Sequence, residues 1–409
     1  MKDWTEFGLH KRQSMSSRTR PTSYPPSRQA MLDRVAELTA APLVGVTTDG
    51  TIQRGLFPLR STGVSTAPLL DAAQGLLATL DAKQRAKLVY DLEAKERRLW
   101  FNIHPAFFRH GLILEDLDAT QRKAALRLME TTLSARGFAQ ARDIMRINAL
   151  LIEITGKTED YGEWPYFITF FGEPSADAPW GWQIDGHHLN LNFFVVGDQL
   201  VCTPSFMGSE PCRISSGHLA GTEVFAPETR GGLALIRSLD AGQAAKAVLA
   251  PSVLPDDLPP ELKHGNDGRM AGGAFKDNAV IPYKGIRADA LTDAQRRLLL
   301  KLVGTYVHWA RDGHAQVKMS EVEAHLDETR FAWIGGTGDQ GPFYYRVQSP
   351  VVLIEFDHHS GVVFDNVVPT HHHIHTVMRT PNGGDYGADL LRQHHERFDH
   401  SNGQHVARR

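Results

Sequence analysis

The chain has 409 residues, of which 42% are hydrophobic, and this is enough to bury a large core in one or two domains. Its formal net charge of -3 shows no basic excess, so nucleic acid is not expected as a partner. No run approaches the roughly 18 apolar residues that would span a bilayer. Two cysteines are too few for a disulfide framework or a thiolate zinc site, so both are expected to be free thiols.

The N-terminal segment, residues 1–28, is polar and rich in Ser, Arg and Pro. It contains no apolar central stretch, so it does not have the pattern of a secretory signal. We expect it to be disordered, or to be an arm that becomes ordered on a partner subunit. The protein is therefore expected to be cytoplasmic, and the sequence leaves open whether it forms a homo-oligomer.

Helix signals follow a short extended region. Apolar residues at helical spacing predict a helix over 69–80, and Asp81 is predicted to cap a second helix over 82–100. Two more helices are predicted over 119–133 and 139–154.

The same helical pattern occurs again in the second half of the chain. The segment around Asp81 resembles the segment around Asp240, and the segment around Gln121 resembles the one around Gln295. Each pair leads into aromatic-rich strands. We predict an α+β fold with an internally duplicated helix-helix-strands unit, in which helices pack on antiparallel sheets. The alternative is chance similarity that follows from helix-capping rules alone.

This duplication divides the chain into a first α+β half over 29–228 and a second over 229–409. The second half is longer because it contains a Pro- and Gly-rich insert at 250–285. A long loop in a compact chain is usually functional or disordered, so the insert is either a lid over a site or a disordered segment.

Twenty histidines are the compositional anomaly of the chain. Two stretches that pair histidines, 180–192 and 370–379, are predicted to be strands, and we align them as equivalent positions of the duplication. Alternate side chains of a strand lie on the same face. In the first stretch His188, Asn190 and Asn192 therefore share a face.

In the second stretch His373 and His375 point the same way. Glu355 lies in the hydrophobic segment 351–357, where a carboxylate must be paired or metal-bound to be tolerated. Together with His188, these residues are predicted to bind a divalent metal ion, namely zinc, iron or manganese.

Other polar and aromatic residues complete the predicted site. Arg379 shares the face of the metal ligands and is a candidate catalytic residue that could bind a substrate carboxylate or phosphate. Asn190, Asn192 and Trp182 are candidates for substrate contacts, although tryptophans more often belong to the core. The alternative to a metal site is a structural network in which Glu355 holds Arg379 or a histidine.

The remaining histidine pairs, at 358–359, 371–372 and 394–395, are expected to be exposed to solvent. The chain contains no dinucleotide-binding glycine motif, no phosphate-binding loop and no serine nucleophile elbow. The usual nucleotide and serine-hydrolase chemistries are therefore not indicated.

Three blocks of sequence carry a resemblance to a known family. They are the Trp-Gly-Trp to Leu-Asn block at 180–192, the segment 203–208, and the C-terminal His-Ile-His block with the residues that follow it. These blocks resemble a bacterial family defined as domain of unknown function 3500. The resemblance runs from about residue 28 to the C-terminus, and it implies no particular reaction.

The residues therefore predict a metal-dependent enzyme that acts on a small-molecule substrate. Hydrolysis would use metal-activated water, with Glu355 or a neighbouring residue moving the proton. Iron-dependent oxygen chemistry is equally compatible with two histidines and a carboxylate. The sequence does not choose between these two reactions. A non-catalytic small-ligand-binding protein and a purely structural role for the histidines are the alternative hypotheses.

Overall fold

A computed structural model describes residues 4–10, 26–103, 107–339, 341–399 and 406–407 of the chain. The helices are α1 (Pro26–Ala40), α2 (Ala67–Ala78), α3 (Ala82–Leu88), α4 (Ala119–Thr132), α5 (Ala135–Thr155), α6 (Ala226–Arg237), α7 (Ala241–Ala247), α8 (Asp293–Val307), α9 (Asp312–Ala324) and α10 (Ala388–Arg397). The strands are β1 (Val89–Tyr90), β2 (Leu112–Ile113), β3 (Tyr166–Phe171), β4 (Trp180–Gly186), β5 (Leu189–Val196), β6 (Gln199–Val201), β7 (Ser205–Ser209), β8 (Val248–Ala250), β9 (Ile286–Arg287), β10 (Arg330–Gly335), β11 (Phe343–Gln348), β12 (Leu353–His358), β13 (Ile374–Arg379), β14 (Phe398–Asp399) and β15 (Val406–Ala407).

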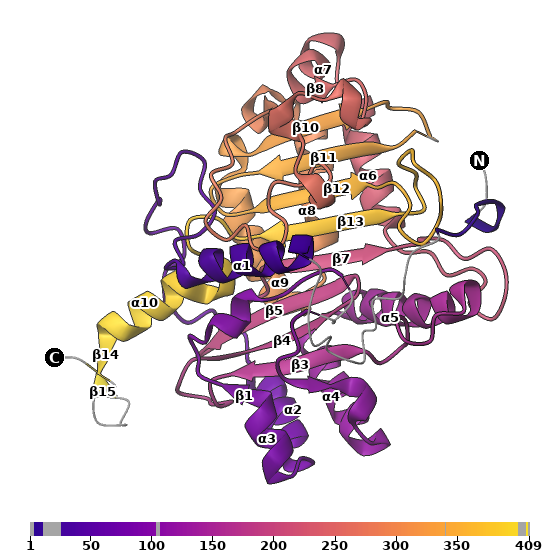
Figure 1. Cartoon of the computed structure of the whole chain (residues 1–409). Coiled ribbons are helices and arrows are strands. Elements are labelled where there is room, and N and C mark those ends of the chain that lie inside the picture. The colour runs from indigo at the N-terminus through magenta and orange to yellow at the C-terminus, as the bar shows by residue number, and fades with distance from the viewer. Residues whose placement is uncertain (1–3, 11–25, 104–106, 340, 400–405, 408–409) are drawn as a thin grey trace.

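One large sheet runs through the molecule (Figure 1). Its strand order is β1-β3-β4-β5-β7-β13-β12-β11-β10-β8, and β2, β6 and β9 pair at its sides. Neighbouring strands are antiparallel except for β1 with β3 and β8 with β10. The magenta strands of the first half and the yellow and orange strands of the second half meet where β7 pairs with β13.

The two halves repeat the same elements around this β7–β13 contact. Each half has a short capped helix that leads into a parallel edge strand, and these helices begin at capping boxes on Asp81 and Asp240. A glutamine amide bonds the second capped helix to the first in both halves, from Gln121 to Gln84 and from Gln295 to Gln243. The α+β fold and its repeated helix-helix-strands unit are confirmed.

The predicted equivalence of the two histidine strands is wrong. Read from the two ends of the sheet, β5 corresponds to β12 and β7 corresponds to β13. The two His-His pairs therefore do not occupy equivalent positions in the repeat. The predicted boundary at residue 228 falls inside α6, and one continuous sheet contains strands from both sides of this boundary. The two halves are therefore repeats within a single sheet.

Two predicted elements differ from the structure. The helix expected over 82–100 ends at Leu88, because Val89 and Tyr90 pair in parallel with β3. The stretch 180–192 is a hairpin, since β4 and β5 pair up to Gly186 and Leu189 and leave only two residues for the turn.

Opposite faces of the sheet are covered by different parts of the chain. On one face, aromatic and aliphatic side chains of the strands form the main core with helices α2, α4, α5, α6, α8 and α9. On the other face, a smaller cluster joins strand residues such as Phe206, Tyr344 and Val377 to Trp100 and to the insert 250–285. The insert is a packed layer, so the disordered alternative is wrong, and polar strand residues lie beneath it.

The described part of the N-terminal segment, residues 4–10, lies along the chain near Phe364. Leu9 forms an isolated bridge with Phe364, and the amide of His10 donates to the carbonyl of Val363. The predicted arm was expected to become ordered on a partner subunit, whereas residues 4–10 pack against their own chain. Residues 26–28 of the predicted disordered segment instead begin α1, and residues 1–3 and 11–25 lie outside the described residues.

Candidate metal centre

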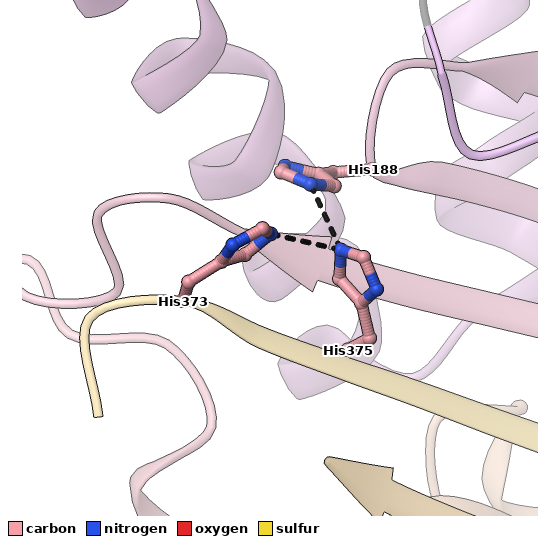
Figure 2. Close-up of side chains that lie close together, drawn as sticks. All are labelled: His188, His373 and His375. Atoms are coloured by element: carbon pink, nitrogen blue, oxygen red, sulfur yellow. Dashed lines mark hydrogen bonds between the residues drawn. The ribbon is translucent and has the colours of Figure 1, made fainter. Parts of the chain in front are cut away.

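Three histidines from distant parts of the sequence converge at one end of β13 (Figure 2). His375 lies in β13, His373 lies just before it, and His188 lies in the β4–β5 turn with a φ of 63°. The Nε2 atom of His375 is 2.9 Å from that of His373 and 3.2 Å from that of His188. All three side chains are buried. The prediction that His188, His373 and His375 come together is confirmed.

Gly208 provides the space for two of these rings. It lies opposite His375 in the pairing of β7 with β13. A Cβ atom at this position would lie 2.9 Å from Cδ2 of His375 and 3.0 Å from Cδ2 of His188, closer than ordinary contact. The absence of a side chain at Gly208 therefore lets both imidazoles lie over β7.

The other nitrogen of His373 fixes the orientation of its ring. Nδ1 lies 2.7 Å from the carbonyl oxygen of Ser360, so Nδ1 carries the proton and Nε2 offers its lone pair to the cluster. The buried carboxylate of Glu210 lies 3.5 Å from the same Nδ1. Glu210 also accepts hydrogen bonds from the backbone amides of Val362, Val363 and Phe364. One buried carboxylate thus binds the loop beside the cluster and lies close to a histidine of the cluster.

The two Nε2 distances from His375 fit a common metal ion. Nitrogen ligands at 2.0–2.1 Å from one ion lie roughly 2.8–3.4 Å from each other in octahedral or tetrahedral geometry. Burial, followed by the neighbouring His359 and His373, lowers the pKa of His375 well below its usual value, so its imidazole is neutral. Neutral imidazole is the form that binds zinc, iron or manganese, and three such ligands leave coordination positions for water or substrate.

The cluster opens into a cavity of 430 Å³. All three histidines line it, together with Asp267 and Arg269 of the insert. Burial raises the pKa of Asp267 to about 6. Arg269 donates from Nε and from its backbone amide to Asp357, so its charge is matched.

A fourth histidine beside the cluster was not predicted. His359 was expected to be exposed, but it is buried, and its ring centroid lies 4.1 Å from that of His375. Its Nε2 atom is 3.2 Å from Asp357 Oδ2. Asp357 lies directly opposite His375 in the pairing of β12 with β13, and the sequence alone does not specify this register. The predicted exposure is also wrong for His358, His372 and His394, which are buried.

Glu355 lies elsewhere on the polar face. It is paired with Val377 in the register of β12 and β13, two residues along from the pair that contains His375. Its carboxylate accepts hydrogen bonds from the amides of Ala271 and Gly272 and from the hydroxyl of Tyr344. The structure does not bring Glu355 into the histidine cluster, and its bonds attach the insert to the sheet.

Arg379 is likewise distant from the cavity that the histidines line. It is completely buried and forms ion pairs with Asp277 and Asp385, the second at 2.9 Å. Asp277 also pairs with Arg98. This charge cluster ties the insert to β13 and to the chain before β2, and it leaves Arg379 without access to a ligand in the cavity.

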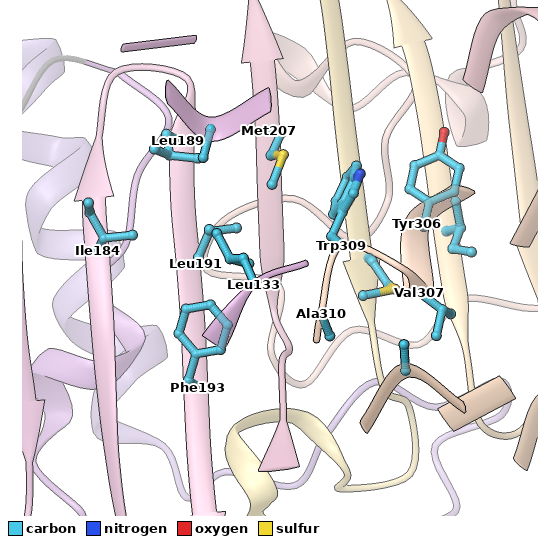
Figure 3. Close-up of a cluster of buried hydrophobic side chains, with 14 of the residues drawn as sticks. Leu133, Ile184, Leu189, Leu191, Phe193, Met207, Tyr306, Val307, Trp309 and Ala310 are labelled. Carbon is cyan, nitrogen blue, oxygen red and sulfur yellow. The ribbon is translucent and has the colours of Figure 1, made fainter. Parts of the chain in front are cut away.

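The residues predicted to contact substrate do not line the cavity either. Trp182 belongs to the opposite face, where it stacks on Phe193 at 4.4 Å in the main core, and Figure 3 shows Phe193 in that core. Asn192 bonds the carbonyl of Pro204 and accepts from Gln183. Asn190 is completely buried, and its amide has no hydrogen-bond partner in the described part of the chain.

These features define a protein with a three-histidine cluster at one end of the central strands of a duplicated sheet. A family model matches residues 62–388, and the chain belongs to this family, which is described as Protein of unknown function (DUF3500). Comparisons with curated proteins and with solved structures gave no match. Within the described residues, every helix is too short or too polar to cross a bilayer.

Proposed function

We propose that the protein is a metal-dependent enzyme that acts on a small organic substrate by hydrolysis. The observation that supports this is the convergence of three Nε2 atoms at the wall of a 430 Å³ cavity. A ligand set of three histidines with an open position is a common arrangement of catalytic zinc. A bound divalent ion would lower the pKa of a coordinated water and supply hydroxide at neutral pH.

The composition of the cluster favours hydrolysis over iron-dependent oxygen chemistry. The oxygenase arrangement combines two histidines with a carboxylate. Among the described residues, the side chains whose possible ligand atoms lie close together are three histidines. Glu355 is hydrogen-bonded to the insert instead.

Proton transfer falls to the residues of this cavity. Asp267 lines it, and a carboxyl with a pKa of about 6 can both accept and release a proton near neutral pH. We propose Asp267 as the proton acceptor, in place of the predicted Glu355. The proposal also includes a small-molecule substrate, a cytoplasmic location and a homo-oligomeric state, and each of these needs its own measurement.

Elemental analysis of the purified, untagged protein tests the metal site. We expect about one zinc, iron or manganese per chain in the parent and loss of that metal in the His373→Ala, His375→Ala double variant. A His218→Ala variant is the matched control, because His218 is an exposed histidine outside the cluster. A folded parent that binds none of these metals would overturn the proposal.

The second hypothesis is a non-catalytic protein that holds a small ligand in the same cavity. It is supported by the volume of the cavity, which is in the range of small-molecule sites. A stoichiometric ligand, with no metal and no turnover, would favour this function over the enzyme.

A further inference from the structure

Exposed apolar side chains lie at the mouth of the histidine cavity. Seven large apolar side chains are exposed in the described part of the chain. Leu9, Val362 and Val367 of this set line the cavity, and Val367 is 86% exposed. Two more members of this set are sequence neighbours of lining residues: Val368 follows Val367, and Leu254 precedes Pro255. Exposed apolar side chains are ordinary when scattered, but here three of the seven line one opening.

Polar contacts connect the loop that carries Val362 to the site. Glu210 accepts from the amides of Val362, Val363 and Phe364 and lies 3.5 Å from Nδ1 of His373. Leu9 is bridged to Phe364. The cavity therefore has exposed apolar side chains in its outer part and buried imidazoles at its inner end, and Glu210 lies against both the loop of Val362 and His373.

We propose that the substrate is amphipathic, with an aliphatic chain that lies against this apolar mouth and a carboxylic ester group that reaches the histidine cluster. This inference rests on the proposed function for the identity of the reacting group. In the reaction, the oxygen of the activated water forms a bond to the acyl carbon and the C–O bond to the alcohol breaks. The departing alcohol oxygen takes up the proton that the water released.

The test measures the binding of probes that differ only in chain length. Octanohydroxamate and acetohydroxamate are titrated into the zinc-loaded protein by calorimetry. We expect the longer probe to bind on the order of 100-fold more tightly, since several methylene groups leave water. A Val362→Ser, Val367→Ser variant should reduce this ratio roughly tenfold, with the Kd for zinc and for acetohydroxamate unchanged. Val280→Ser, at an exposed valine outside the cavity, is the control and should leave the ratio unchanged.

A second arm separates this inference from the proposed function. Octanoate and acetate are titrated into the metal-free protein with the same variants. Tighter binding of octanoate that depends on the two valines would support the apolar site even if zinc failed to bind and the enzyme proposal fell. Equal binding of short and long probes in both arms would overturn the inference. A change of oligomeric state in the valine variant, with probe binding unaltered, would also overturn it and would assign the mouth to a subunit contact.

Discussion

Gly208 and His375 face each other across β7 and β13, and the imidazole of His375 occupies the space that a side chain at Gly208 would fill. The site thus depends on a residue that contributes no ligand. His188 also needs this space, so one glycine makes room for two of the three imidazole rings.

We expect Gly208→Ala to weaken metal binding roughly tenfold or more, because the added methyl group displaces both rings from a shared ion. Its cost to the free energy of unfolding should be about 1–3 kcal/mol, as for other overpacked sites. Competition with a chelator measures the metal Kd, and chemical denaturation measures stability. The control is Gly75→Ala in α2, where a Cβ would contact nothing. An unchanged metal Kd in Gly208→Ala would show that the rings are not held as the structure indicates.

Glu355 and the histidines should respond differently to mutation. Glu355→Gln should lower the free energy of unfolding by about 1–3 kcal/mol, because a neutral amide cannot replace all three hydrogen bonds of the buried carboxylate. It should leave the metal content of the protein unchanged. Loss of the metal with no loss of stability would make Glu355 a ligand and contradict its placement beneath the insert.

Glu210 should affect both stability and metal affinity. Glu210→Gln disturbs the loop that includes Val362 and the environment of His373, so we expect metal binding to weaken roughly 10- to 100-fold. Denaturation and chelator competition are again the measurements. The exposed Glu223→Gln is a matched control and should change neither quantity. An effect on stability alone would limit Glu210 to a role in the loop.

Asp185 should make the stability depend on pH. Burial raises its pKa to about 8, while the amide of Phe101 donates to it and opposes the shift. Between the unfolded value near 3.8 and about 8, the folded state keeps a proton that the unfolded state has released. The free energy of unfolding therefore falls as pH rises through this window, by up to about 1.4 kcal/mol per pH unit from this group.

Asp185→Asn removes this dependence, because the amide is neutral at every pH and its oxygen can still accept from Phe101. We expect the variant to gain stability relative to the parent as pH increases from 4 to 8 in denaturation experiments. A constant difference between the two proteins across this range would show that Asp185 is ionised in the folded state.

Local rules determined part of this protein from the sequence alone. Capping boxes and helical periodicity placed the helices that begin after Asp81 and Asp118, and their recurrence at Asp240 indicated the duplication. The alternation rule predicted that His373 and His375 point the same way, and their Nε2 atoms do lie 2.9 Å apart, although His373 precedes β13.

Pairing between distant strands decided the rest. His188 reaches His375 because β7 lies between β5 and β13. Glu355, Arg379, Asn192 and Trp182 had the right chemistry but belong to other contacts, and His359 and Glu210 had no signal that distinguished them. A sequence specifies which face of its own strand a side chain occupies, whereas its partners depend on register between strands far apart in the chain, and only the tertiary structure sets that register.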